Sequence, residues 1–266
     1  MDRRDFVTTS IGASLGSMLA AAEGRAQASP AAPQVLELRW YRFRFGPMEA
    51  RWSEYAKDVL IPALNRAGVK PVGAFGVAVG PDSPSVLVLL PHPSAESVVT
   101  LAARVTADAE YERAAAAFRS LAASDPPYVR RESSLLVAFD RAPSLELRSE
   151  PLASPSRIFE LRTYESHNEA AGATKIEMFE ESGEIEIFRR VGITPVFFAR
   201  NVVGPGLPSL TYLVVFADAA AREKAWAAFR EDPEWVKLRA APRYANSEIL
   251  TNIHSMILRP TAFSQI

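Results

Sequence analysis

The chain has no cysteine and only three histidines among its 266 residues. The lack of cysteine excludes disulfide bonds, thiolate metal sites and cysteine nucleophiles. No two histidines have the spacing of metal ligands on one helix, and the H-E-x-x-H pattern of zinc peptidases is absent. The glutamates of residues 177–186 have no histidine in an E-x-x-H arrangement. We therefore expect them to form a solvated acidic face rather than a di-metal site.

The chain also has no large excess of positive or negative charge. Thirty Lys and Arg side chains stand against 31 Asp and Glu, which gives a net charge of −1. A chain of this balance gives no support for binding nucleic acid or an anionic membrane surface. With 48% hydrophobic and 23% charged residues it has an ordinary globular composition. Its length allows one large domain or two small ones.

The N-terminus resembles an export signal. The motif RRDFV, with Arg3, Arg4 and Phe6, is a twin-arginine pattern, and an uncharged run of small residues follows it. The sequence AQA then offers a cleavage site after Ala28. We expect residues 1–28 to be a twin-arginine signal peptide, with the export machinery as a partner and a periplasmic or secreted mature protein. The other interpretation is a frayed or anchoring helix, although the run is weak for a membrane span.

The chain contains two near copies of one segment. Residues 35–41 read VLELRWY, and residues 158–164 read IFELRTY, 123 positions later. The agreement continues at a spacing of 124, where R-x-G-x-x-P occurs at residues 66–71 and again at residues 190–195. A period this long is too large for a solenoid repeat. It indicates a duplication that produces two domains of similar fold.

Each copy predicts the same order of elements, β-α-β-β-α-β, which is the ferredoxin-like arrangement. Ser94, Asp108 and Asp232 are suited to cap helices. Pro62 should kink or split the first helix of the first copy, and the corresponding helix of the second copy should run through about residues 173–191.

A proline-rich stretch separates the two copies and is interpreted as a linker. We therefore expect an α+β protein whose mature part consists of an N-terminal tail at residues 29–34, a first repeat at 35–140, the linker at 141–156, a second repeat at 157–260 and a C-terminal tail at 261–266.

Several motifs of the second copy together resemble the NIPSNAP family. They are IFELRTY at residues 158–164, GITPV at 192–196, LVVF at 213–216 and DPEW at 232–235. The resemblance covers the second repeat well, and the first repeat is similar to a more divergent relative. It implies a dimeric α+β barrel in which two ferredoxin-like sheets pair face to face, both supplied here by one chain. The wider superfamily includes cofactor-free monooxygenases, heme-degrading enzymes, peroxidases and isomerases, and the resemblance implies no single reaction.

Alternation along the duplicated strands separates two faces. One face carries a charged and phenolic triplet in each copy: Glu37, Arg39 and Tyr41 in the first, and Glu160, Arg162 and Tyr164 in the second. The other face is more apolar, so we expect it to pack on the helices. The Glu-Arg-Tyr face would then point into the barrel, where buried charges must be paired.

The triplets have two interpretations. In one they form a structural network of ion pairs and hydroxyls. In the other they form a site for a small anionic or phenolic ligand between the sheet and the helices of the second repeat. Arg162 would hold the anion, Tyr164 would donate a hydrogen bond, and Glu160 would orient Arg162 or act as a base. His167 and Asn201 complete this candidate site.

The functional hypothesis is an exported protein that binds a small organic ligand, with monooxygenase-like chemistry as an extension. The alternative is a non-enzymatic scaffold for protein–protein interaction, and the sequence does not decide between an enzyme and a binding protein. Heme ligation by His167 or His254 stays open, as does further association of duplicated chains. We assign no catalytic residue and no metal site.

Overall fold

The computed structural model describes residues 32–81, 83–147 and 149–266. The expected signal peptide, with Arg3, Arg4, Phe6 and Ala28, lies outside these residues, so its prediction stands on the sequence alone. In the described part of the chain, no helix combines the length and the apolar character needed to cross a membrane.

The described residues of the first half form four strands and six helical segments. They are β1 (Val35–Arg42), α1 (Met48–Tyr55), the π-helical turn η1 (Ala56–Leu60), α2 (Ile61–Arg66), β2 (Gly73–Val79), β3 (Ser85–His92), α3 (Ala95–Val99), α4 (Leu101–Thr106), α5 (Ala109–Arg119) and β4 (Arg130–Ala138). The π-helical turn ends at Leu60, two residues before Pro62, which has no N–H to continue the helical ladder. The irregularity expected at Pro62 is therefore present.

The second half repeats this order after a short 3₁₀ turn, η2 (Glu150–Ala153). Its elements are β5 (Ile158–Glu165), α6 (Glu169–Glu180), α7 (Glu184–Arg190), β6 (Thr194–Val203), β7 (Ser209–Phe216), α8 (Ala219–Glu231), α9 (Pro233–Ala240), η3 (Pro242–Tyr244), α10 (Asn246–Ile249) and β8 (Asn252–Pro260). The single helix expected near residues 173–191 is instead two helices, because Gly183 adopts a left-handed conformation with φ of 89° between them.

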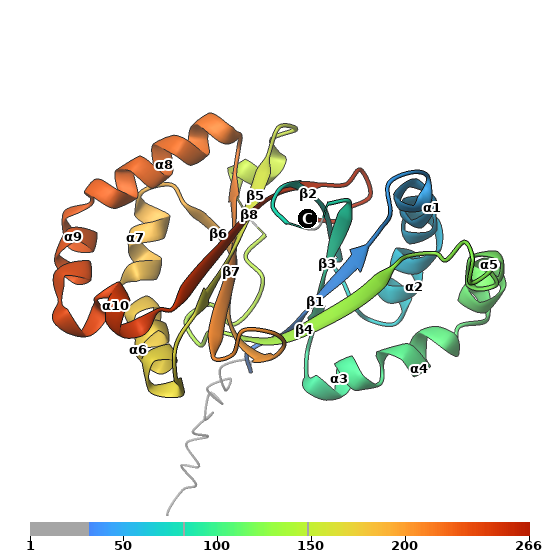
Figure 1. Cartoon of the computed structure of the whole chain (residues 1–266), viewed down its shortest axis with the longest axis horizontal. Helices are drawn as coiled ribbons and strands as arrows, with labels where there is room; N and C mark the ends of the chain where they lie inside the picture. The colour runs from blue at the N-terminus through green and yellow to red at the C-terminus, as the bar shows by residue number, and fades with distance from the viewer. Residues whose placement is uncertain (1–31, 82, 148) are drawn as a thin grey trace, which may run out of the picture. The chain divides into compact units, whose positions relative to one another are not determined.

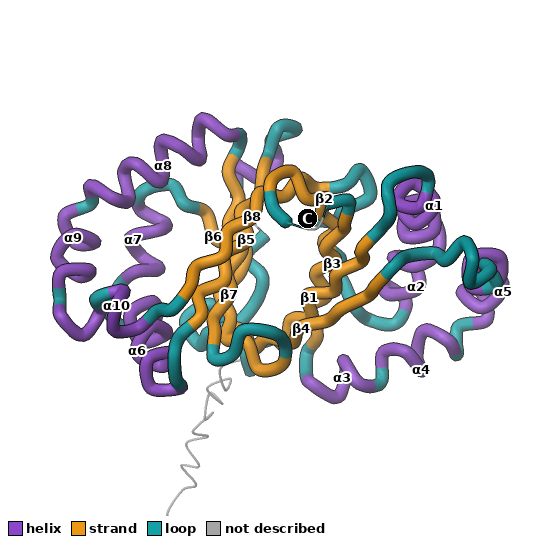
Figure 2. The backbone as a smooth tube through the Cα atoms, in the orientation of Figure 1, coloured by secondary structure: helices purple, strands orange, loops and turns teal. Residues whose placement is uncertain are grey.

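The eight strands close into an antiparallel barrel in the order β1-β3-β2-β8-β5-β7-β6-β4. Each half contributes one ferredoxin-like sheet, β4-β1-β3-β2 and β8-β5-β7-β6, and the seams β2–β8 and β4–β6 join them. Figure 1 shows the helices of the first half on one side of the strands and those of the second half on the opposite side, and Figure 2 shows the strands between them. The expected intramolecular α+β barrel is confirmed.

The barrel interior is apolar, contrary to the expectation from the strand pattern. Leu36 and Leu38 of β1 pack there with Phe159 and Leu161 of β5. The Glu-Arg-Tyr face is turned outward, toward the helices, as Tyr41 shows by its contact with the α1 side chain Trp52. The assignment of the two faces was wrong because alternation groups residues on a face without showing what covers it. Here helices cover one face and the opposite sheet covers the other.

The two ends of the barrel differ. Near the start of β1 and β5, the linker side chains Leu145, Leu147 and Leu152 and the C-terminal Ile266 pack against the apolar interior. At the other end a cavity of about 780 Å³ opens between Trp40, Thr163 and other residues near the ends of β1 and β5. The linker is therefore part of the packed structure and closes one end of the barrel.

Candidate functional site

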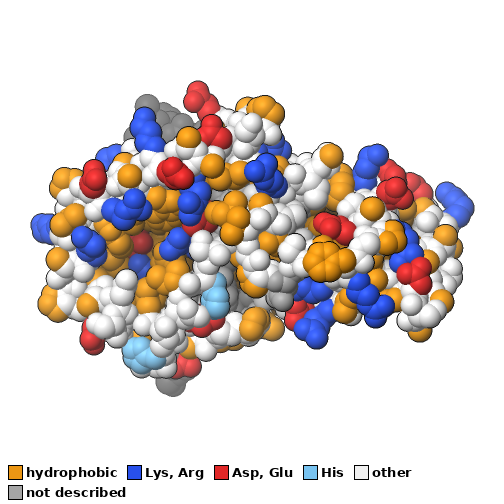
Figure 3. All heavy atoms as spheres, turned by 45° about the horizontal axis from the view of Figure 1, so that its top comes forward, with side chains coloured by type: hydrophobic (Ala, Val, Ile, Leu, Met, Phe, Trp, Pro, Cys, Tyr) orange, Lys and Arg blue, Asp and Glu red, His pale blue; other side chains and the backbone are white. Residues whose placement is uncertain are grey.

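A cavity of about 420 Å³ lies between the sheet and the helices of the second half. Its walls come from β5, α6, α7, α8, α9 and the segment after α9. Five basic and two acidic side chains line it, together with aromatic rings: Arg162, Lys175, Arg222, Arg230, Arg239, Glu184, Glu223, Tyr164, Trp226, Phe229 and Trp235. Figure 3 shows a hollow in this part of the surface, with hydrophobic side chains inside it and Lys and Arg side chains around it.

Glu160 lies behind this cavity and is completely buried. Its carboxylate accepts hydrogen bonds from Arg222 Nε at 2.8 Å, Trp226 Nε1 at 2.7 Å and Ser255 Oγ at 2.8 Å, and from Arg162 Nη1 at 2.9 Å. Burial alone would raise the pKa of Glu160, but the donors Arg222, Ser255 and Arg162 lower it below its ordinary value. Both oxygens are therefore engaged, which suits Glu160 to orient Arg162 and not to act as a base.

Arg162 is held in place by Glu160, but not all of its N–H donors have a partner. It gives only Nη1 to Glu160, because Arg222 and Trp226 occupy the rest of that carboxylate. Its guanidinium carbon lies 4.9 Å from the ring centre of Trp226 and 5.6 Å from that of Tyr164, and its Nε is buried without a hydrogen-bond partner. A cation oriented between aromatic rings, with unused donors, can bind an anion in the cavity.

Tyr164 points to the same side of β5 as Arg162. Its hydroxyl shares a hydrogen bond of 2.8 Å with the hydroxyl of Tyr212 on β7. Burial, with Tyr164 beside it, raises the pKa of Tyr212 well above its ordinary value of 10.0. The Tyr212 phenol therefore keeps its proton at neutral pH, and the hydroxyl pair can present an O–H donor to a bound oxygen atom.

Lys175 and Glu184 form a buried ion pair in the wall of the cavity. Lys175 Nζ donates to Glu184 Oε2 across 2.7 Å, and both side chains are 2% exposed. The expectation of a solvated acidic face at residues 177–186 is wrong for Glu184, although Glu181 and Glu186 are exposed. Gly183 redirects the chain between α6 and α7, and Glu184 is the first residue of α7.

The first half has a matching cavity of about 560 Å³ next to Glu37, Arg39 and Tyr41. Here Arg39 binds both oxygens of Glu37, with Nε and Nη2 each at 2.9 Å. Val98 and Ala102 line this cavity and lie 124 positions before Arg222 and Trp226. The first half therefore keeps the strand triplet, but Arg39 is paired with both oxygens of Glu37, and Val98 and Ala102 stand where the second half has Arg222 and Trp226.

The remaining sequence-predicted residues lie elsewhere. His167 is exposed and lines a separate cavity with Arg243 and Glu248. Asn201 donates to Ser209 Oγ across 2.9 Å and lines the open end of the barrel. The predicted cluster around Arg162 and Tyr164 therefore does not include His167 or Asn201, although Asn201 shares another cavity with Tyr164.

Neither histidine left open for heme fits that role. His254 Nε2 contacts Glu165 Oε1 at 2.9 Å and Asn252 at the same distance, and its side chain is half exposed. His167 stands among charged neighbours in a solvent-facing cavity. Heme ligation needs a free imidazole nitrogen facing an apolar slot, so we derive no chemistry through heme. Among the described residues, no three His, Asp or Glu side chains are grouped so that they could hold a metal ion.

Sequence reasoning missed the side chains that the helices bring to the cavity: Lys175, Glu184, Arg222, Trp226 and Trp235. Trp226 and Trp235 are partly buried, pack against the hydrophobic core of the second half and also line the cavity wall. A signal was present in the duplication. Arg222 and Trp226 are one helical turn apart and replace the small apolar residues Val98 and Ala102 of the first copy.

Comparison with known proteins agrees with the fold. The family model described as NIPSNAP matches twice, over residues 36–133 and 159–265. A candidate monooxygenase from Lactobacillus acidophilus has a TM-score of 0.57 at 7% identity, over 86% of this chain and 94% of that one. A candidate monooxygenase from Fusobacterium nucleatum has a TM-score of 0.55 at 8% identity, over 86% and 93%. At these identities the two structures show a common fold.

A NIPSNAP-like domain protein from Burkholderia xenovorans is 25% identical over 42% of this chain and 90% of its own, with a TM-score of 0.37. No curated protein matches the chain.

Proposed function

Because the chain belongs to the NIPSNAP family, in which it carries two copies of the domain, we propose that its second half binds a small aromatic anion in the cavity beside Arg162. The observation that carries the proposal is the incomplete pairing of Arg162. Its counterpart Arg39 binds both oxygens of Glu37, whereas Arg162 gives a single nitrogen to Glu160.

The composition of the cavity favours an anion with a ring. Its basic side chains outnumber its acidic ones by five to two, and Trp226, Trp235 and Tyr164 offer flat apolar surfaces. A volume of about 420 Å³ is within the usual range for small-molecule sites. Phenolates and aromatic carboxylates combine a negative oxygen with a ring that can stack. They are the ligand class that we propose.

Monooxygenase-like chemistry is the extension that the related folds support. An ionised phenol is electron-rich, and its oxidation by dioxygen to a quinone and water balances without another reductant: one oxygen atom enters the ring and the other leaves as water. Quinone absorbance after incubation of the protein with a naphthol in air would test this step separately from binding.

Export is a further part of the proposal, supported by the RRDFV motif and the AQA sequence alone. In this view the protein reaches the periplasm through the twin-arginine machinery after folding. Replacement of Arg3 and Arg4 by lysine should leave the protein in the cytoplasm, and cell fractionation would show it.

Ligand binding is tested by titrating the mature protein with benzoate, salicylate and para-nitrophenol while recording tryptophan fluorescence. Arg162→Ala should weaken binding by about 10- to 100-fold, the value of a lost charge-assisted hydrogen bond. Arg39→Ala is the matched control and should leave this binding intact. If Arg162→Ala only lowers thermal stability, the Glu-Arg-Tyr face is structural and a scaffold role is favoured instead. A native mass spectrum of protein purified from cells would show a retained ligand directly.

A further inference from the structure

The buried pair of Lys175 and Glu184 is the most unusual feature of the cavity. The ammonium of Lys175 lies 4.5 Å from the ring centre of Phe179 and 5.4 Å from that of Tyr164. Both members are almost fully buried, yet both line the cavity. Removing two charges from water carries a desolvation cost that their attraction only partly offsets, so such a pair is weak evidence for a role in stability.

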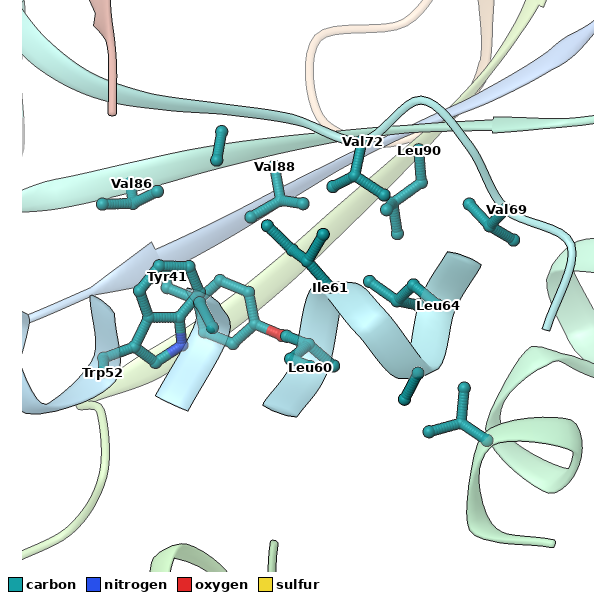
Figure 4. Packing of buried hydrophobic residues seen from close by; sticks show 14 of the residues in the cluster. Tyr41, Trp52, Leu60, Ile61, Leu64, Val69, Val72, Val86, Val88 and Leu90 are labelled. Carbon is teal, nitrogen blue, oxygen red and sulfur yellow. The ribbon is translucent and has the colours of Figure 1, made fainter. Parts of the chain in front are cut away.

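The first half shows that the fold does not need charges at the positions of Lys175 and Glu184. Trp52 lies 123 positions before Lys175, and Leu60 lies 124 positions before Glu184. The ring centres of Trp52 and Tyr41 lie 4.6 Å apart, and Lys175 packs on the ring of Tyr164 in a similar way. Figure 4 shows the Tyr41 hydroxyl directed toward Leu60. The same wall is therefore built from apolar side chains in one half and from an ion pair in the other.

Glu184 has charged and phenolic groups near it on three neighbouring elements. Lys175 contacts it from α6, Arg162 lies near it on β5, and Tyr212 lies near it on β7. Burial raises the pKa of Glu184, and the charges of Lys175 and Arg162 oppose that rise. A carboxylate in this environment accepts a proton more readily than one in water.

We propose that Glu184 accepts the proton of a phenolic ligand entering the cavity, and that Lys175 then pairs with the phenolate. The O–H bond of the phenol breaks, its electron pair stays on the phenol oxygen, and the proton forms a new O–H bond on the Glu184 carboxylate. This inference rests on the proposed function, since it concerns the same cavity, and it narrows the ligand class to acidic phenols.

The exchange keeps the number of buried charges constant. Before binding, the ammonium of Lys175 faces the carboxylate of Glu184, and after binding it faces the phenolate while Glu184 is neutral. Arg162 lies on the adjacent wall with unused donors and adds a second cation for the new anion. Ionisation of the ligand thus avoids the cost of creating a new unpaired charge in a buried site.

The test uses para-nitrophenol, whose ionised form absorbs visible light, at a pH below the pKa of the free compound. The mature protein should convert the bound compound to its anion, with one anion per chain at saturation. Glu184→Gln should lose this absorbance. Glu186→Gln, which changes an exposed glutamate of the same helix, should retain it. If Glu184→Gln ionises the compound as well as the parent protein does, the inference is wrong.

A second variant covers the case in which Glu184→Gln does not fold, since it leaves Lys175 without its carboxylate. The double variant Lys175→Met with Glu184→Leu reproduces the apolar wall of the first half and should fold without ionising the phenol. Ionisation by this variant would also overturn the inference.

Benzenesulfonate, which is permanently charged, separates a failure of the role of Glu184 from a failure of the proposed function. Binding of benzenesulfonate without ionisation of the phenol refutes the role of Glu184 alone, and failure to bind either compound refutes the proposed function with it.

Discussion

The indole of Trp226 donates a hydrogen bond of 2.7 Å to the carboxylate of Glu160, and this contact joins helix α8 to strand β5. Arg222, one turn earlier on the same helix, binds the same carboxylate. The helix therefore does not rest on the sheet through apolar contacts alone. It is fixed by two donors at one buried anion, and the cavity wall that α8 provides is positioned by that anion.

Replacement of Glu160 by glutamine should destabilise the protein by about 3 kcal/mol, because two arginines lose their buried counter-charge. Chemical denaturation monitored by circular dichroism measures the change. Glu181→Gln, at an exposed position, is the control and should be neutral. A stability equal to that of the parent protein would show that Arg162 and Arg222 are adequately solvated without Glu160.

Acid should weaken the first half through Glu37. Burial alone would raise the pKa of this carboxyl, but the nearby His92 ring, the Arg39 guanidinium and the Ser133 hydroxyl lower it from 4.5 to about 2. Because the folded-state pKa is lower than the unfolded value, the contribution to stability is fully present above pH 4.5. It is lost as the pH falls toward 2, and it amounts to about 3 kcal/mol.

The measurement for Glu37 is the unfolding free energy at pH 7, 4.5 and 2.5 in the parent protein and in Glu37→Gln. The difference between the two proteins should shrink as the pH falls through this window. A difference that stays constant with pH would mean that Glu37 titrates normally in the folded state.

Gly183→Ala should destabilise the protein by about 1 kcal/mol through backbone strain alone. Gly183 has φ of 89°, and a Cβ added there would meet nothing within 4 Å. The thermal midpoint reports the change. Gly76→Ala is the comparison, since Gly76 also has open space around it but no positive φ, and it should be close to neutral. Equal effects of the two substitutions would exclude strain as the cause.

Asp232 caps α9 by accepting hydrogen bonds from the N–H groups of Glu234 and Trp235, and it also binds Arg190. Asp232→Ala should cost about 1–2 kcal/mol, and Asp232→Asn should recover most of this because an amide oxygen can still cap. Asp108→Ala should destabilise the protein by a similar amount, since Asp108 caps α5 and binds Arg66. Loss of stability in only one half would show that the two caps are not equivalent.

Much of the fold could be predicted from local patterns. The helix caps Ser94, Asp108 and Asp232 lie where the sequence placed them, and the two copies of the strand pattern became β1 and β5. These features depend on neighbouring residues, so a short window of sequence contains them. The pairing of the two sheets into a barrel followed from the duplication together with the family resemblance.

The orientation of the strand faces could not be predicted in this way. Both faces are buried, one by helices and one by the opposite sheet, and alternation alone does not rank two buried faces. Glu184 was misplaced for a related reason. Its neighbours Glu181 and Glu186 are exposed, and only the turn at Gly183 brings Glu184 to Lys175. The helix side chains of the cavity depend on tertiary packing between residues far apart in the chain, as the contact of Trp226 with Glu160 across 66 positions shows.

The single chain that supplies both sheets also has a genetic consequence. In a barrel built from two identical subunits, every substitution appears twice, so neither cavity can change without the other. Here Trp52 and Lys175 are separate codons, as are Leu60 and Glu184. Selection can therefore retain charges at two positions of one half while the corresponding positions of the other half become apolar. Duplication followed by fusion freed the halves to diverge while the β2–β8 and β4–β6 seams kept them in one barrel.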